Sequence, residues 1–104
     1  MNKYIIVTTL CNNEEIANKI VSVLLEKKLV AGSQILRVHS KYWWNNQLEE
    51  CDEFKLEFRT KSNLFNEIER VIKGIHDYKV AEISSCKIEN ASQEFLNWID
   101  KNTK

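Results

Sequence analysis

The spacing of apolar residues changes several times along this chain, and each change predicts a new secondary-structure element. Residues 4–10 (YIIVTTL) are a compact run rich in β-branched side chains, which predicts a strand buried on both faces. Apolar residues then recur every three or four positions, which predicts a helix that ends near Leu29. Asn12, followed by Glu15 three residues later, resembles a capping box and marks the start of that helix.

The middle of the chain has the two-residue period of long antiparallel strands. Alternation over residues 34–44 and again over residues 48–60 predicts two strands. Asn45 and Asn46 between them predict a tight turn, because Asn tolerates the left-handed backbone conformation. Strands of this length exceed the usual five or six residues, so we expect a hairpin that projects beyond the sheet and exposes strand edges.

Helical spacing returns in the second half of the chain. It predicts a helix over residues 64–75 with Ser62 or Asn63 as its cap, then a strand over residues 80–88 and a short last helix capped by Ser92. The order is therefore strand, helix, strand, strand, helix, strand and helix. This order predicts an α+β protein of the ferredoxin-like, split βαβ kind, with an antiparallel sheet and an added C-terminal helix.

Length and composition narrow the class of protein. The 104 residues suit a single domain, residues 1–104, because the chain has no Pro and only two glycines from which to build a linker. Fifteen basic residues balance fifteen acidic ones, so no net field attracts a polyanion, and we expect no nucleic acid partner. No apolar stretch approaches the roughly 20 residues needed to span a bilayer, so we expect no membrane association. The first residues lead into a strand rather than the apolar segment of a signal peptide, which predicts a cytoplasmic protein.

This chain lacks the residues that two other functions of ferredoxin-like proteins require. The third predicted strand has no glycine over residues 54–59, and its aromatic side chains lie on the face that must pack against the helices. It therefore does not suit the base-stacking strand of an RNA-recognition module. Residues 10–15 offer neither the Gly nor the Arg of an acylphosphatase anion site, and two acids there would repel phosphate.

Tyr42, Trp43 and Trp44 at the end of the predicted hairpin are the most unusual local feature. Neighbouring residues on a strand point to opposite faces, so at most one tryptophan can join the chain's own core. A hairpin that folds back on its own sheet is one explanation. An interface with another chain accounts better for rings on both faces, so we predict that these three residues line an interface or pocket.

Cysteines and histidines are the candidate metal ligands. The three cysteines are odd in number and far apart, which predicts reduced thiols rather than a disulfide framework or a paired-cysteine zinc site. Cys11, at the end of the first strand, is either a ligand or a small buried apolar residue. His76, at the end of the second helix, is either a ligand or a cap favoured by the helix dipole, and the cap is the commoner role. No Ser-His-Asp set or Gly-rich phosphate loop can be assembled, which predicts a non-enzymatic protein without an organic cofactor.

Four segments resemble motifs of the CutA divalent-ion-tolerance family, and together they extend over nearly the whole chain. Residues 42–50 (YWWNNQLEE) resemble that family's YWWEGKIEE hairpin, and residues 7–15 (VTTLCNNEE) its VTTCPNEE region with one shifted cysteine. Residues 76–83 (HDYKVAEI) are similar to HPYEVPEI, and residues 95–99 (FLNWI) to the terminal YLxWI. The motifs fall in the right order on the predicted elements.

The resemblance implies a tight homotrimer in which extended hairpins pair between subunits, in the manner of PII signalling proteins. It also implies a role in tolerance to copper and other divalent cations, with copper bound by Cys11 and His76. Glu50, Tyr78 and Glu82 are similar to that family's acidic and aromatic positions, and we expect them at the interface or pocket. A different class stays open, namely a PII-like sensor that binds a nucleotide or another small metabolite between subunits.

The chain departs from the family's pattern at three positions. Asp77 and Ala81 stand where the family has prolines, and Gly32 stands where it usually has a cysteine. Asp77 could add an oxygen ligand beside His76, but a single His-Asp pair is a weak site for a transition metal.

Overall fold

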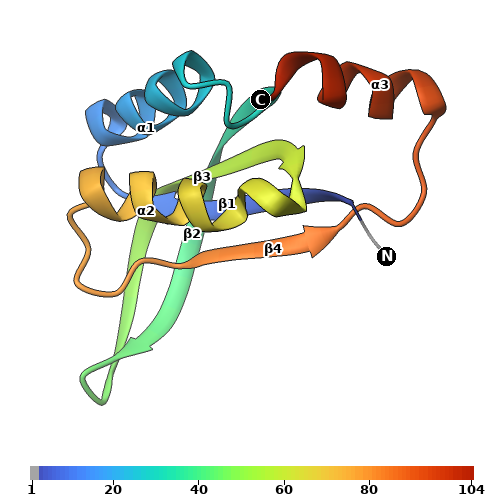
Figure 1. Cartoon of the computed structure of the whole chain (residues 1–104). Coiled ribbons are helices and arrows are strands. Elements are labelled where there is room, and N and C mark those ends of the chain that lie inside the picture. Colours follow the sequence, from blue (N-terminus) through green and yellow to red (C-terminus); the bar gives the residue numbers. More distant parts are fainter. Residues whose placement is uncertain (1–2) are drawn as a thin grey trace.

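The computed structural model describes residues 3–104, and these form a four-stranded antiparallel sheet with three α-helices (Figure 1). The strands lie in the order β2-β3-β1-β4. Their bounds are Tyr4–Cys11 (β1), Gly32–Trp44 (β2), Gln47–Lys61 (β3) and Ile83–Lys87 (β4). The helices are Glu14–Glu26 (α1), Phe65–Ile75 (α2) and Gln93–Asn102 (α3). The predicted order of elements is confirmed. No helix among the described residues is long and apolar enough to cross a membrane.

The hydrophobic core lies between one face of the sheet and the helices α1 and α2, which lie on the same side of it (Figure 1). Val7 of β1 is paired with Phe58 of β3, and Thr9 with Leu56, and all four side chains are fully buried. Alternate residues of β1 are only half-buried. The expectation of a strand buried on both faces is therefore wrong, because α1 and α2 cover only one face of the sheet.

Two helix starts differ from the predictions. Asn13, not Asn12, caps α1, and its side-chain oxygen accepts a 3.1 Å hydrogen bond from the backbone N–H of Ile16. A 3-10 turn, Ser62–Leu64, leads directly from β3 into α2, and no side chain caps that helix. The chain enters α2 straight from a strand, so Ser62 lies inside the turn rather than before the helix. The predicted Ser92 cap of α3 is confirmed.

The β2-β3 hairpin projects from the rest of the molecule (Figure 1). Its two strands pair without a break from Gly32 opposite Arg59 to Trp44 opposite Gln47. Asn45 and Asn46 both have positive φ angles, 50° and 62°, as the predicted tight turn requires. Strand β1 ends where Cys11 pairs with Phe54. Beyond that point residues 38–44 and 47–53 pair only with each other, and we call this part the ribbon.

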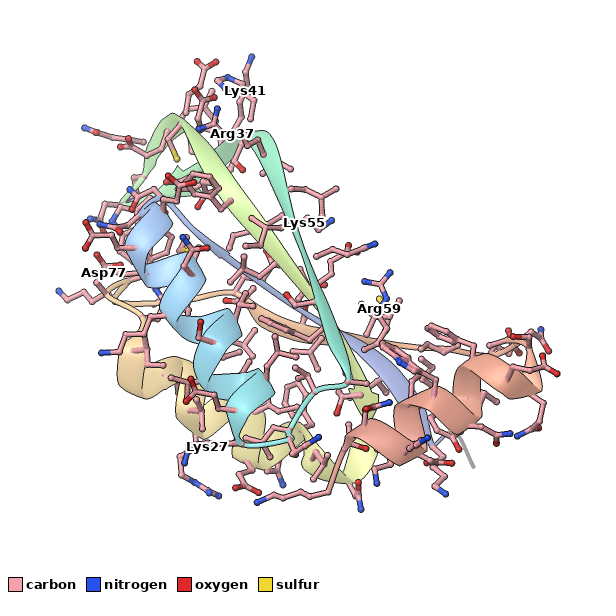
Figure 2. All side chains as sticks on the ribbon, turned by 90° about the horizontal axis from the view of Figure 1, so that it is seen from above. Lys27, Arg37, Lys41, Lys55, Arg59 and Asp77 are labelled. Carbon is pink, nitrogen blue, oxygen red and sulfur yellow. The ribbon has the colours of Figure 1, made fainter. Side chains whose placement is uncertain are left out.

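The last helix covers one end of the sheet face that α1 and α2 leave open. The Tyr4 hydroxyl donates a 2.7 Å hydrogen bond to Asp100 of α3. Trp98 packs over Gly32, where an added Cβ would lie 2.8 Å from the Trp98 ring. A glycine is therefore needed at this close approach. Figure 2 shows Lys55 and Arg59 projecting from the sheet on the side away from α1.

Candidate functional site

A hollow of about 930 Å³ lies between the ribbon and the loop over residues 76–82. The loop replaces the first part of the strand that we predicted over residues 80–88, because β4 begins only at Ile83. Aromatic and acidic side chains both line the hollow. They include Tyr42, Trp43, Trp44, Glu53, Tyr78 and Glu82. Five of these six were predicted interface or pocket residues, and only Glu53 was not.

Glu53 is a buried carboxylate at the base of the ribbon, with 6% of its surface exposed. The Tyr78 hydroxyl donates a 2.8 Å hydrogen bond to one of its oxygens. Burial, and then this bond to a negative partner, raise the pKa of Tyr78 well above its ordinary value. Tyr78 therefore stays protonated and remains a hydrogen-bond donor at any physiological pH.

A second tyrosine lies on the same face of the ribbon as Glu53. The Tyr42 oxygen is 3.6 Å from the Sγ of Cys51, within hydrogen-bond range for a sulfur. This contact, with some burial, raises the pKa of Tyr42 to about 12. Nothing in the sequence indicated that Cys51 contacts Tyr42. Their cross-strand positions identify the contact only once the register of the hairpin is known.

His76 ties the loop to the end of β1 through both of its ring nitrogens. Nε2 lies 2.6 Å from the carbonyl oxygen of Leu10, and since a carbonyl only accepts, Nε2 carries the proton. Nδ1 accepts a 3.1 Å hydrogen bond from the backbone N–H of Tyr78. The Asp77 carboxylate is 3.7 Å from Nδ1, but an unprotonated nitrogen forms no ion pair with it. The side chain is 1% exposed, so the neutral ring is held as a structural link.

Cys11 lies beside this link but faces the core. It has no exposed surface, and its thiol points to the carbonyl oxygen of Asn13 at 3.7 Å. Burial raises the pKa of the Cys11 thiol, which disfavours the thiolate that a metal ion would need. The two predicted ligands come from neighbouring parts of the fold, but in this conformation neither offers a vacant donor atom. The residues present do not fit a preformed copper site at Cys11 and His76.

The charged groups around the hollow are mixed, with more acidic than basic side chains. Glu53, Asp77 and Glu82 line it together with Lys41 and Lys79. Glu82 accepts a 3.4 Å hydrogen bond from Ser84, and the side chains of Asp77 and Glu82 are exposed. Within residues 3–104 no three His, Cys, Asp or Glu side chains are close enough to hold one metal ion.

Glu50 contacts other residues of the ribbon rather than Cys11 or His76. Its carboxylate touches the Nε2 of His39, and the Nζ of Lys41 is 3.9 Å away. Asp52 contacts the other ring nitrogen of His39 at 2.7 Å. This cluster on the ribbon was not predicted, because it depends on which residues of β2 and β3 lie opposite each other.

The ribbon exposes large apolar side chains on both of its faces. Trp43 is 73% exposed and its cross-strand partner Leu48 is 65% exposed. Trp44, on the opposite face, is 40% exposed, and Tyr42 on that face is 38% exposed. Neither tryptophan joins the core of the chain. The prediction that at least one of them must meet solvent or another molecule is confirmed.

The fold and this site define an α+β protein whose split βαβ sheet carries a projecting aromatic hairpin over an acidic hollow. Residues 5–102 match the family model described as "CutA1 divalent ion tolerance protein". The chain belongs to the CutA family of divalent-cation tolerance proteins.

Two relatives are similar over nearly their whole length. The divalent-cation tolerance protein CutA of Archaeoglobus fulgidus is 36% identical over 101 residues, which is 97% of this chain and 97% of that protein. The CutA of Pyrococcus horikoshii is 31% identical over 100 residues, 96% of this chain and 98% of that one. The solved structure of the periplasmic divalent cation tolerance protein CutA from Archaeoglobus fulgidus superposes with a TM-score of 0.94 at 33% identity, covering 97% of this chain and 99% of that one.

Proposed function

We propose that this protein acts in the response to divalent cations as a non-enzymatic homotrimer. The observation that carries the proposal is the ribbon, which holds Trp43 and Trp44 outside the core on opposite faces. Apolar rings exposed in this way are typical of interface residues, because burying them against a partner supplies much of the binding free energy. Membership of the divalent-cation tolerance family supports the cation part of the proposal.

The edge of β3 supports assembly through the same hairpin. Among the described residues, β2 is the only strand paired with positions 47–53, so one row of backbone groups is open to a strand from another chain. A strand added there would extend the ribbon that carries Tyr42 and Trp44 into a wider sheet. The resemblance of residues 42–50 to the family's hairpin favours three copies arranged in the manner of PII proteins.

A cation site completed by a second chain agrees best with the geometry. No site is complete within the described residues of one chain, and copper at Cys11 and His76 would have to displace the hydrogen bond that Nδ1 of His76 accepts from Tyr78. The exposed carboxylates of Asp77 and Glu82 remain able to meet an ion at the mouth of the hollow. Oxygen donors of this kind suit hard divalent cations better than they suit copper.

Two further parts of the proposal rest on the side chains at the site. Both ring nitrogens of His76 are already hydrogen-bonded, so the ring has no free nitrogen to act as a general base. The raised pKa of Cys11 keeps its thiol protonated, so it is a poor nucleophile. Both observations support a non-enzymatic role. All three cysteines are unpaired thiols, which supports a reducing compartment such as the cytoplasm.

Calorimetric titration of the purified protein with magnesium, zinc, copper and ATP tests this function. We expect saturable binding of at least one divalent cation, weakened in the double variant Asp77→Asn, Glu82→Gln and unchanged in Glu94→Gln, an exposed acid on α3. If Cys11→Ser and His76→Ala weakened cation binding and the acidic double variant did not, the cation site would instead be at Cys11 and His76. Saturable ATP binding without any cation binding would favour the nucleotide sensor instead.

A further inference from the structure

His39 lies on the ribbon between two carboxylates of the neighbouring strand. It is directly opposite Asp52, and Glu50 lies diagonally across. The Nδ1 of His39 is 2.7 Å from an oxygen of Asp52, and its Nε2 contacts an oxygen of Glu50. One imidazole ring thus links β2 to two positions of β3 within the ribbon.

The two carboxylate contacts determine which protonation state of the His39 ring fits this arrangement. An ionised carboxylate only accepts hydrogen bonds, so both nitrogens of His39 must donate for both contacts to be attractive. Only the imidazolium form carries two N–H groups. When the ring is neutral, one of the two contacts places a nitrogen lone pair against a carboxylate oxygen and becomes repulsive.

We propose that His39, Glu50 and Asp52 form a proton-dependent clamp, which holds the two strands of the ribbon together when His39 is protonated and loosens when it is not. Oppositely charged side chains that face each other across two strands stabilise the pairing of those strands, so a link of this kind has a measurable effect on the order of the ribbon. His39 also lines the hollow, so the clamp orders one of its walls. The clamp requires neither a bound cation nor a second chain, so it is independent of the proposed function.

The charged side chains that contact the ring or lie beside it come from β2 and β3, and the loop across the hollow adds Asp77, Lys79 and Glu82. Besides Glu50 and Asp52, Lys41 lies on this face and approaches Glu50 at 3.9 Å. Arg37, also on this face, is placed over the ring of Phe54, its charged carbon 5.5 Å from the ring centre. The two ring nitrogens of His39 point away from each other, so one metal ion could not bind His39 and both carboxylates in this arrangement.

The direction of the pH dependence follows from the two carboxylates. Asp52 first, and then Glu50, raise the pKa of His39 above its ordinary value. A group whose pKa is higher in the folded form contributes stability below its unfolded pKa, about 6.5 for His, and loses it as the pH rises through the folded pKa. The ribbon is therefore held more tightly in mildly acidic solution than in mildly alkaline solution.

Amide hydrogen exchange of the ribbon tests the clamp. We expect protection factors, corrected for intrinsic exchange rates, to be about two- to fivefold higher at about pH 6 than at about pH 8.5, as is typical of an exposed ionic contact. The ratio should fall to about one in His39→Gln and decrease in Asp52→Asn, while amides that join β1 to β3 show no such change.

A second measurement keeps the test valid if the ribbon of His39→Gln is disordered. The ring resonances of His39 in the wild-type protein should titrate with a raised pKa, and the double variant Glu50→Gln, Asp52→Asn should return that pKa to its ordinary value. His39 and the buried His76 are the only histidines, so the assignment is simple. Equal protection at both pH values, or a His39 pKa that the double variant does not lower, would overturn the clamp.

Discussion

The Tyr78 hydroxyl donates a 2.8 Å hydrogen bond to the buried carboxylate of Glu53, and this bond fixes the loop after α2 to the base of the hairpin. Among the described residues no ion pair and no second side-chain donor reaches this carboxylate, so Glu53 depends on Tyr78 as its partner. A carboxylate buried to this degree is costly unless it is hydrogen-bonded.

Tyr78→Phe removes that donor without changing the shape of the ring. Because a buried charged acceptor then lacks its partner, we expect the free energy of unfolding to fall by about 1–3 kcal/mol. Tyr42→Phe is the matched control, because Tyr42 is more exposed and contacts only the weak acceptor Cys51. Urea denaturation at one protein concentration compares the two. An equal loss in both variants would show that the Glu53 bond contributes nothing special.

The two glycines respond to a methyl group in opposite directions. Gly32→Ala places a Cβ 2.8 Å from the Trp98 ring, so the ring or the helix α3 that carries it must shift, and we expect a loss of about 1–3 kcal/mol. Gly74 lies inside α2 with nothing within 4 Å of a new Cβ. Gly74→Ala should therefore stabilise the protein by about 0.5–1 kcal/mol through helix propensity. Thermal unfolding followed by circular dichroism measures both, and a neutral Gly32→Ala would mean that α3 is not held against the sheet.

The three cysteines should differ in reactivity toward a thiol reagent. Cys86 is exposed, Cys51 is half-buried, and Cys11 is buried with a raised thiol pKa. Since the thiolate is the reactive form, modification should occur first at Cys86 and at Cys11 only when the protein unfolds. Peptide mass spectrometry after timed alkylation gives the order. Early labelling of Cys11 in the folded protein would contradict its place in the core.

Local sequence signals predicted most of the fold. The two-residue period of residues 34–44 and 48–60, and the Asn45-Asn46 pair between them, predicted the hairpin, because strand alternation and turn chemistry act between near neighbours. The Ser92 cap was predicted for the same reason. Residues 80–82 (VAE) looked like part of a strand, but contacts of His76 and Tyr78 with distant segments hold them in a loop.

The candidate site could be predicted only in part. The aromatic residues of the hairpin and the loop stood out by type and by resemblance, and the structure brings Tyr42, Trp44 and Tyr78 to one hollow. Glu53 and His39 did not stand out, because an acid or a histidine on a strand is ordinary until the register shows what lies opposite it. The fixed tautomer of His76 depends on a carbonyl 66 residues away in the chain, which no local pattern indicates.

Sedimentation equilibrium at tens of micromolar protein tests the central claim, assembly through the ribbon, most directly. We predict a particle of three times the chain mass of 12.3 kDa. Trp44→Ala should dissociate it, because Trp44 lies on the face of the ribbon that also carries Tyr42 and Glu53, and Trp43→Ala on the opposite face should weaken it less. A wild-type protein that sediments as a single chain would contradict the account.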